Sequence, residues 1–185
     1  MACTQTLSNI ARPCGNGKGG LQTTIFVALR SEVDLAGIEY VETAEPYNTI
    51  KTLEATNWYK FEFGKNAADF TSEAQYDGTT GEFSYFKNTL NLSFRKMDAS
   101  LRLSINSLLA DECVVVFQDG NGVNYVLGLE EAVTSESCSH TTGTAKTDSN
   151  VVSIALSDTT STLPLHASEA VITAIKTAME SEEGE

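Results

Sequence analysis

Polar and apolar residues alternate along the chain between residues 67 and 96, with one interruption at a turn rich in glycine and threonine. The polar members are Asp69, Thr71, Glu73, Gln75 and Asp77 before the turn, and Lys87, Thr89, Asn91, Ser93 and Arg95 after it. Most positions between them are aromatic or aliphatic. Successive side chains of a strand point to opposite faces of a sheet. The pattern therefore predicts a long hairpin, with strands at residues 67–77 and 83–96, that has one packed and one solvated face.

Shorter apolar runs predict the other strands of a β-rich domain. They lie at residues 23–29, 37–41, 58–63, 113–117, 123–129 and 152–156. The run at residues 113–117 is apolar at every position, which is typical of a strand buried on both faces. Residues 119–122 follow it with a sequence that tolerates a tight turn, so a second hairpin is expected there. Residues 135–150 are rich in serine and threonine and are expected to form a polar loop.

Two further segments repeat their apolar residues with the period of an α-helix. The first, at about residues 97–110, has an apolar face of Leu101, Ile105, Leu108 and Leu109. The second, at about residues 168–180, has an apolar face of Val171, Ile172, Ile175 and Met179. Asp98 and Ser168 are the expected N-terminal caps. The whole pattern predicts a mainly β fold, a β-sandwich or half-barrel with a long hairpin, one flanking α-helix and a C-terminal helix.

Length and composition indicate one folded domain. A chain of 185 residues, of which 41% are hydrophobic, is long enough to bury one core and short for two. We expect a flexible N-terminal arm at residues 1–22, a single β-rich domain at 23–165, and a C-terminal helix with an acidic tail at 166–185. No segment approaches the roughly 20 consecutive apolar residues of a membrane span, and no basic segment followed by an apolar run begins the chain. A soluble protein made in a cytoplasm is expected.

The net charge argues against one class of partner, and the spacing of the cysteines indicates whether they form disulfides. The formal charge of −13 argues against a protein that holds nucleic acid through its phosphates, because such binding needs clustered Lys and Arg. The four cysteines, Cys3, Cys14, Cys113 and Cys138, have no paired close spacing and are expected to be free thiols.

Two partial motifs for a cofactor or a metal each lack a required part. Residues 15–20 resemble a phosphate-binding loop, but Lys18 is followed by two glycines in place of the Ser or Thr that such a loop needs. His140 and His166 have no Cys or carboxylate beside them at ligand spacing. No metal or cofactor is therefore predicted.

A catalytic pair of carboxylates is the remaining candidate for enzyme chemistry. A glycoside hydrolase would draw its acid and its nucleophile from Glu62, Asp69, Glu73 and Glu82. Sugar-binding sites generally also present exposed aromatic residues, whereas the aromatic residues here share the face of the packed apolar residues. The sequence therefore predicts no catalytic residue.

Three segments, at residues 2–7, 114–122 and 142–148, and the order of the elements over most of residues 1–165 carry a likeness to a known family. In these features the chain resembles the major tail tube protein of tailed phages that infect Bacteroidetes. It implies a non-enzymatic virion protein that forms hexameric rings stacked into a tail tube. The implied partners are further copies of the chain and other tail proteins, with double-stranded DNA passing through without being held. The implied location is the virion tail, assembled in the host bacterial cytoplasm.

The resemblance also assigns roles to residues of the long hairpin. The long hairpins of neighbouring subunits would join into a continuous barrel, while loops and terminal arms would connect successive rings. The residues that would line the channel are Asp69, Thr71, Glu73, Gln75, Thr89, Asn91 and Ser93. The residues expected between subunits are Trp58, Lys60, Lys87, Arg95 and Lys96. For Trp58, the alternative of a core position under the arm or under a helix is equally open.

Elementary electrostatics agrees with a channel role. A conduit for a polyanion works best with a neutral or acidic wall, because a lysine-rich wall would hold the DNA. Residues 57–96 carry five basic and five acidic residues, with the acids near the turn and the bases near the open end, so ion pairs between subunits are expected.

Two other classes of function stay open. Another virion ring or decoration protein, such as a head-tail connector, a tail terminator or a capsid auxiliary protein, would have a similar β-rich pattern. A glycan-binding β-sandwich module would instead be expected to show a signal peptide and exposed aromatic residues.

Overall fold

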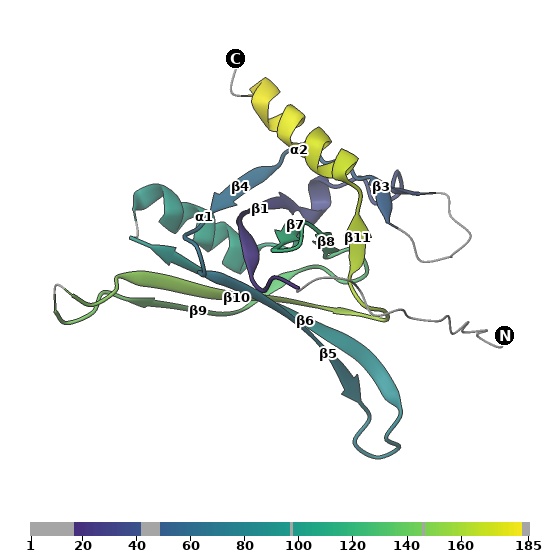
Figure 1. Ribbon diagram of the computed structural model, residues 1–185, viewed down its shortest axis with the longest axis horizontal. Helices are drawn as coiled ribbons and strands as arrows, with labels where there is room; N and C mark the ends of the chain where they lie inside the picture. The colour runs from purple at the N-terminus through teal and green to yellow at the C-terminus, as the bar shows by residue number, and fades with distance from the viewer. Residues whose placement is uncertain (1–16, 42–48, 97, 146, 183–185) are drawn as a thin grey trace.

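The computed structural model describes residues 17–41, 49–96, 98–145 and 147–182, without the side chains of residues 181 and 182 (Figure 1). Its elements in chain order are β1 (Leu21–Leu29), a 3-10 helix (Arg30–Glu32), β2 (Glu39–Tyr40), β3 (Ile50–Thr52), β4 (Tyr59–Glu62), β5 (Ala68–Tyr76), β6 (Phe83–Arg95), α1 (Ala99–Ala110), β7 (Cys113–Asp119), β8 (Asn124–Leu127), β9 (Thr134–Thr141), β10 (Val151–Thr160), β11 (Leu165–Ala167) and α2 (Glu169–Glu182). The expected mainly β fold with two helices is confirmed.

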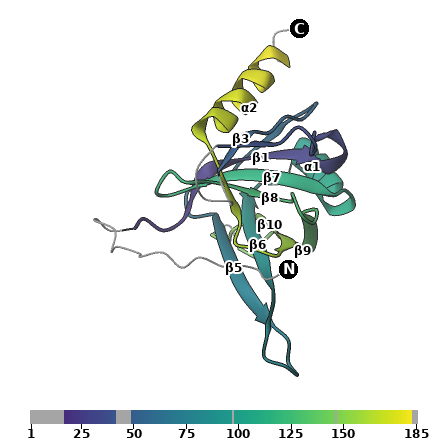
Figure 2. The same cartoon turned by 90° about the vertical axis from the view of Figure 1, so that its right-hand side faces the viewer.

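The strands form two sheets that pack on each other as in a β-sandwich. The larger has seven strands in the order β2-β3-β11-β8-β7-β1-β4, and the smaller has four in the order β5-β6-β10-β9. Side chains of both sheets and of α1 make one core cluster. A second cluster lies between the seven-stranded sheet and α2, which covers the side of that sheet opposite to the four-stranded sheet (Figures 1 and 2). The molecule thus has three layers.

Strands β1 and β7 lie side by side in the middle layer and are buried on both faces. In β7, Val115 and Phe117 belong to the cluster between the sheets, whereas Val114 and Val116 belong to the cluster under α2. The strand predicted from the unbroken apolar run at residues 113–117 is confirmed, and its two-sided burial explains the absence of alternation.

Strands β5 and β6 form the predicted long hairpin, in which Ala68 pairs with Leu92 and Ala74 with Phe86. The turn between them is held by Asp77, whose Oδ1 accepts hydrogen bonds from the backbone N–H of Thr80 at 2.8 Å and of Thr79 at 2.7 Å. These two bonds lower the pKa of Asp77 below its ordinary value. The far end of the hairpin extends beyond the rest of the body (Figure 1).

The expectation of a polar loop at residues 135–150 is wrong for its first half, where β9 lies. This strand pairs with β10, with Thr141 opposite Val151 and Cys138 opposite Ile154. Most of its side chains are exposed, since it lies at the edge of the sheet. An edge strand that buries few side chains has no need of apolar residues at alternate positions, so the hydrophobic pattern does not report it. The short strand β11 was also not predicted, and it follows the strand expected to be the last.

The two helices occur where their periodicity places them. Asp98 caps α1 as expected, because its Oδ1 accepts a hydrogen bond from the N–H of Leu101 at 2.8 Å. Ser168 does not cap α2 in this way, since its buried hydroxyl has no hydrogen-bond partner. Leu109 was expected on the packed face of α1 and is 44% exposed. No helix within the described ranges is long and apolar enough to cross a membrane.

The chain enters the domain through a glycine-rich segment that lies on the β7–β8 turn. The N–H of Lys18 donates to Asn121 Oδ1 at 2.7 Å, and Asn121 Nδ2 donates to the carbonyl oxygen of Lys18 at 3.1 Å. The N–H of Gly120 donates to the carbonyl oxygen of Gly20 at 2.8 Å. The element that follows Lys18 is strand β1, whereas a phosphate-binding loop is followed by a helix. Residues 1–16 of the expected arm lie outside the described residues.

Candidate assembly surface

The solvated face of the four-stranded sheet carries all the residues that the sequence assigned to a channel wall. The hairpin register places these residues opposite one another: Asp69 with Asn91 and Thr71 with Thr89, with Glu73 opposite Lys87 and Gln75 opposite Tyr85. Asn91 Nδ2 donates a hydrogen bond to Asp69 Oδ2 at 2.9 Å. The hydroxyl oxygen of Ser93 lies 3.2 Å from that of Ser153 on β10. Hydroxyls, amides and carboxylates thus form a continuous polar surface across three strands.

Lys87 lies on this solvated face, and its charge is compensated by a residue that the sequence did not indicate. Lys87 Nζ lies 2.6 Å from Glu136 Oε1 of β9, which makes a hydrogen bond and an ion pair. The hydrogen bond to Glu136 raises the pKa of Lys87 above its ordinary value, and the nearby Glu73 adds a smaller Coulombic contribution. The ammonium therefore has a carboxylate partner within the same chain and does not stand as an isolated positive charge.

Strand β9 adds further polar residues to the four-stranded sheet, and the sequence had predicted a loop for these residues. Its segment Thr134–Thr141 contains mainly Ser and Thr, together with Glu136, Cys138 and His140. His140 Nε2 lies 3.1 Å from Asn150 Oδ1, across the β9–β10 hairpin. No local signal located β9, because its residues do not alternate between apolar and polar, and the segment between Thr141 and Val151 is longer than the roughly two to five residues of a tight hairpin.

Both edges of the four-stranded sheet are open. Within the described residues, β5 pairs only with β6, and β9 pairs only with β10. Each of these strands therefore presents one row of backbone N–H and C=O groups without a strand partner. All three pairings in the sheet are antiparallel, so β5 and β9 run in opposite directions. If the β9 edge of one copy were placed beside the β5 edge of another in the same orientation, the new pairing would be antiparallel as well.

The residues expected between subunits fall into three different environments. Trp58 is 5% exposed and belongs to the cluster under α2, so its side chain is a core residue and not a surface anchor. Lys60 pairs with Glu62 of its own strand at 3.2 Å, and Lys87 pairs with Glu136. Arg95 and Lys96 are exposed at the open end of the hairpin. Two of the four basic residues thus already have an acidic partner within the same chain.

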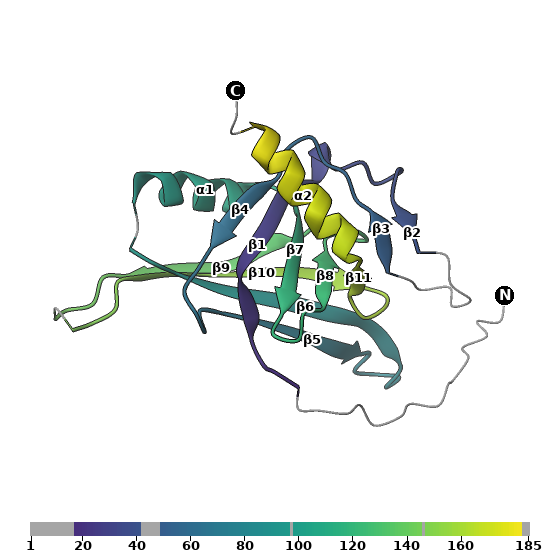
Figure 3. The same cartoon turned by 45° about the horizontal axis from the view of Figure 1, so that its top comes forward.

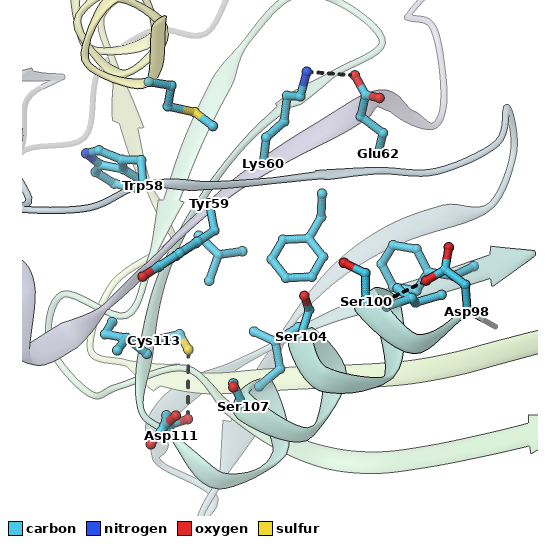
Figure 4. A pocket seen from close by; sticks show the side chains of 17 residues that line it. Trp58, Tyr59, Lys60, Glu62, Asp98, Ser100, Ser104, Ser107, Asp111 and Cys113 are labelled. Atoms are coloured by element: carbon cyan, nitrogen blue, oxygen red, sulfur yellow. Dashed lines mark hydrogen bonds and ion pairs between the residues drawn. The ribbon is translucent and has the colours of Figure 1, made fainter. Parts of the chain in front are cut away.

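A groove of about 790 Å³ lies between β4 and α1 (Figure 4). Phe61, Leu101 and Leu108 contribute to its apolar part, and the serines of α1 line its other side. Cys113 also lines this groove, and burial raises the pKa of its thiol to about 11, with the carboxylate of Asp111 adding to the shift. The thiol is protonated at neutral pH and is a poor nucleophile. The lining contains no histidine among the described residues.

The other partial motifs are not brought together by the fold. Glu62 lies in the seven-stranded sheet, whereas Asp69 and Glu73 lie in the four-stranded sheet. His166 packs edge-on against the ring of Tyr125, with 5.0 Å between the ring centres. Within the described ranges, no group of three or more His, Cys, Asp or Glu side chains is placed to hold a metal ion.

One face of the four-stranded sheet thus carries a continuous set of polar side chains and is bounded by two open edges. No family model, curated protein or solved structure matches this chain.

Proposed function

We propose that this protein is a virion structural protein, the major tail tube subunit of a phage, whose copies form rings around a channel that conducts DNA. The observation that carries the proposal is the four-stranded sheet, which combines two open edges with one polar face. Rings of six, stacked into a tube, are the assembly expected from the resemblance described above.

The open edges support closure into a ring. Unpaired edge strands as long as β5 and β9, with nine and eight residues, promote uncontrolled association unless they are covered. A circular arrangement in which every β9 pairs with the β5 of the next copy satisfies both edges at once. The opposite directions of β5 and β9 allow this repeat with antiparallel pairing at each junction.

The polar face suits a wall along which DNA slides. Its acids Asp69, Glu73 and Glu136 outnumber its bases Lys87 and Arg95, and Lys87 is bound to Glu136. Duplex DNA binds proteins mainly by releasing counterions to Lys and Arg, so a wall of this composition gives the phosphates little to bind. The same face is solvated in the single subunit, with Asp69 and Glu73 exposed.

Microscopy of the purified full-length protein tests the proposal. Rings with a central hole are expected in negative stain, and tubes are expected at high protein concentration. Monomers at every concentration would contradict the proposal, and a monomer that binds glycans on an array would favour the alternative of a glycan-binding module.

Disulfide trapping tests the β5–β9 junction directly. Cys138 is an exposed free thiol on β9, opposite the core residue Ile154. Ser72→Cys and Ala74→Cys each place a thiol on β5 on the corresponding side of the sheet, because Ser72 and Ala74 alternate with the solvated residues. Oxidation of the variant in register is expected to give a ladder of covalent multimers. The ladder should vanish when Cys138→Ser is added. Rings that form without any ladder would contradict this junction.

A further inference from the structure

An aromatic cluster lies exposed at the far end of the long hairpin. Tyr76 of β5 is 63% exposed and Phe83 of β6 is 44% exposed. The rings of Tyr76 and Phe83 are 6.1 Å apart, and those of Phe83 and Phe86 are 4.9 Å apart, so the three side chains lie on the same side of the sheet. Phe86 is opposite Ala74, whose position alternates with that of the solvated Glu73 and Gln75. The cluster therefore continues the packed face of the sheet.

The cluster is exposed because the subunit's own second layer ends before it. Nearer the body, Phe70 of β5 occupies the same face and is covered by the seven-stranded sheet, with its ring 5.0 Å from Phe117 and 5.9 Å from Tyr125. The hairpin then extends past that sheet (Figure 1, Figure 2 and Figure 3). Contiguous exposed aromatic side chains of this kind mark interaction surfaces, and aromatic residues are enriched among those that dominate binding energy.

The element that would cover the cluster follows from the strand order. A neighbour whose β9 lies beside β5 brings its own α1 to the packed side of the sheet, because α1 packs beside β9. The strand registers place Thr134, at the start of β9, level with Thr89 and Thr71, so β9 begins toward the end of the sheet at which Tyr76 and Phe83 extend several residues further. The last turn of α1 is also at this end, since Cys113 shortly after α1 bridges to Val133.

The last turn of α1 presents an exposed apolar side chain, Leu109, which is 44% exposed. A second exposed leucine on the same helix, Leu103, is 63% exposed but lies nearly two turns earlier and about 120° away around the helix axis. Leu109 is therefore at the correct end of the helix, and Leu103 serves as its matched comparison.

We propose that the hairpin cluster of one copy, led by Tyr76 and Phe83, packs against the C-terminal turn of α1 of the next copy, at Leu109. This contact rests on the proposed ring. It joins two different surfaces of the same chain, and a repeated contact of this kind closes into a ring when the rotation between copies closes. The neighbour's α1 thereby covers the hairpin cluster, which the subunit's own seven-stranded sheet does not reach.

Three single variants of the full-length protein test the contact: Phe83→Ser, Leu109→Ser and the comparison Leu103→Ser. Assembly is measured by sedimentation velocity and negative stain over a concentration series, and folding is checked by thermal unfolding of the monomer. Phe83→Ser and Leu109→Ser are each expected to raise the concentration for half-assembly by roughly tenfold or more, while Leu103→Ser leaves it nearly unchanged. Monomer unfolding temperatures should stay close to that of the unsubstituted protein, since all three side chains are substantially exposed.

Mixing gives a readout that a folding defect does not reproduce. The Phe83→Ser protein keeps an unaltered α1, and the Leu109→Ser protein keeps an unaltered hairpin cluster. In a mixture of the two, one unaltered junction can therefore form between them. Dimers are expected in the mixture at concentrations where neither variant alone dimerises. Absence of these dimers would contradict the pairing of the cluster with Leu109.

The outcomes separate this contact from the ring itself. If the unsubstituted protein forms no ring, the proposed function fails. If it forms rings and Phe83→Ser forms them equally well, the ring stands and the contact is wrong, with the cluster then covered by a successive ring or another protein. If Leu103→Ser weakens assembly as much as Leu109→Ser, the assignment to the C-terminal turn of α1 is overturned.

Discussion

Asp158 shows how a single buried side chain connects the two sheets. This residue of β10 is 4% exposed. Its Oδ2 accepts a hydrogen bond from the N–H of Gly128, just after β8, at 2.8 Å, and its Oδ1 accepts one from Asn88 Nδ2 of β6 at 2.9 Å. Gly128 has φ +93° and lies so close to the backbone of Cys113 that a Cβ atom would collide with its carbonyl oxygen. A carboxylate, an amide and a glycine thus bring three strands together at one point.

The buried carboxyl group of Asp158 predicts a specific dependence of stability on pH. Burial raises its pKa above the ordinary value of 3.8, and the bonds from Asn88 and Gly128 offset only part of the effect. The folded state therefore binds the proton more tightly than the unfolded state does. The stabilisation from this group is fully present below pH 3.8 and is lost as the pH rises through the folded pKa.

Asp158→Asn removes this titration while keeping an oxygen that can accept from Gly128. We expect the free energy of unfolding of the wild-type protein, relative to that of Asp158→Asn, to fall as the pH is raised from about 3 to about 7. Urea unfolding at a series of pH values measures the difference. Parallel curves for the wild type and Asp158→Asn would refute the prediction.

At the scale of elements, a local signal determines where α1 begins, and tertiary contacts determine where it packs. Its start is determined locally by Asp98, whereas its packing depends on Ile105 and Leu108, which are buried in the cluster between the sheets. The helix links β6 to β7 and lies beside β9. Its position therefore depends on both sheets.

Removal of the cap of α1 is expected to have a measurable effect on stability. Asp98→Ala should lower the free energy of unfolding by about 1 kcal/mol, because the N–H of Leu101 loses its acceptor. Asp98→Ser and Asp98→Asn retain a capping oxygen and should lose much less. Urea unfolding at neutral pH is the measurement. Equal losses for all three variants would show that the carboxylate acts in another way.

At the scale of the whole molecule, we predict that the polar face of the four-stranded sheet has little attraction for phosphate. The chain has a formal charge of −13, and the described part of that face has its Lys87 paired with Glu136. This property belongs to the surface as a unit, because it depends on residues of β5, β6 and β9 together.

Addition of positive charge to this face should create affinity for DNA. Thr71 and Thr89 lie opposite each other on it, and the double substitution Thr71→Lys with Thr89→Lys introduces two adjacent cations. The variant is expected to bind a short DNA duplex at low salt, with an affinity that falls steeply as salt is added. Fluorescence anisotropy at several salt concentrations measures this. The Thr71→Gln, Thr89→Gln variant is the control. Equally tight binding by the wild-type protein would contradict a non-adhesive wall.

The sequence alone was sufficient for the long hairpin, the doubly buried strand β7 and the two helices, because each buries its side chains with a regular period. The same alternation placed Asp69, Thr71 and Glu73 on one solvated face, as the structure has them. Their role in a channel stays a prediction.

Only the tertiary structure decided which surfaces are left uncovered. It showed β9 as an edge strand, buried Trp58 under α2, paired Lys87 with Glu136, and left the hairpin cluster and Leu109 exposed. None of these has a local pattern, since each depends on which distant segment happens to lie against it. Burial that repeats along one element is recorded in the sequence of that element, whereas contact between elements, and its absence, is determined when the layers pack.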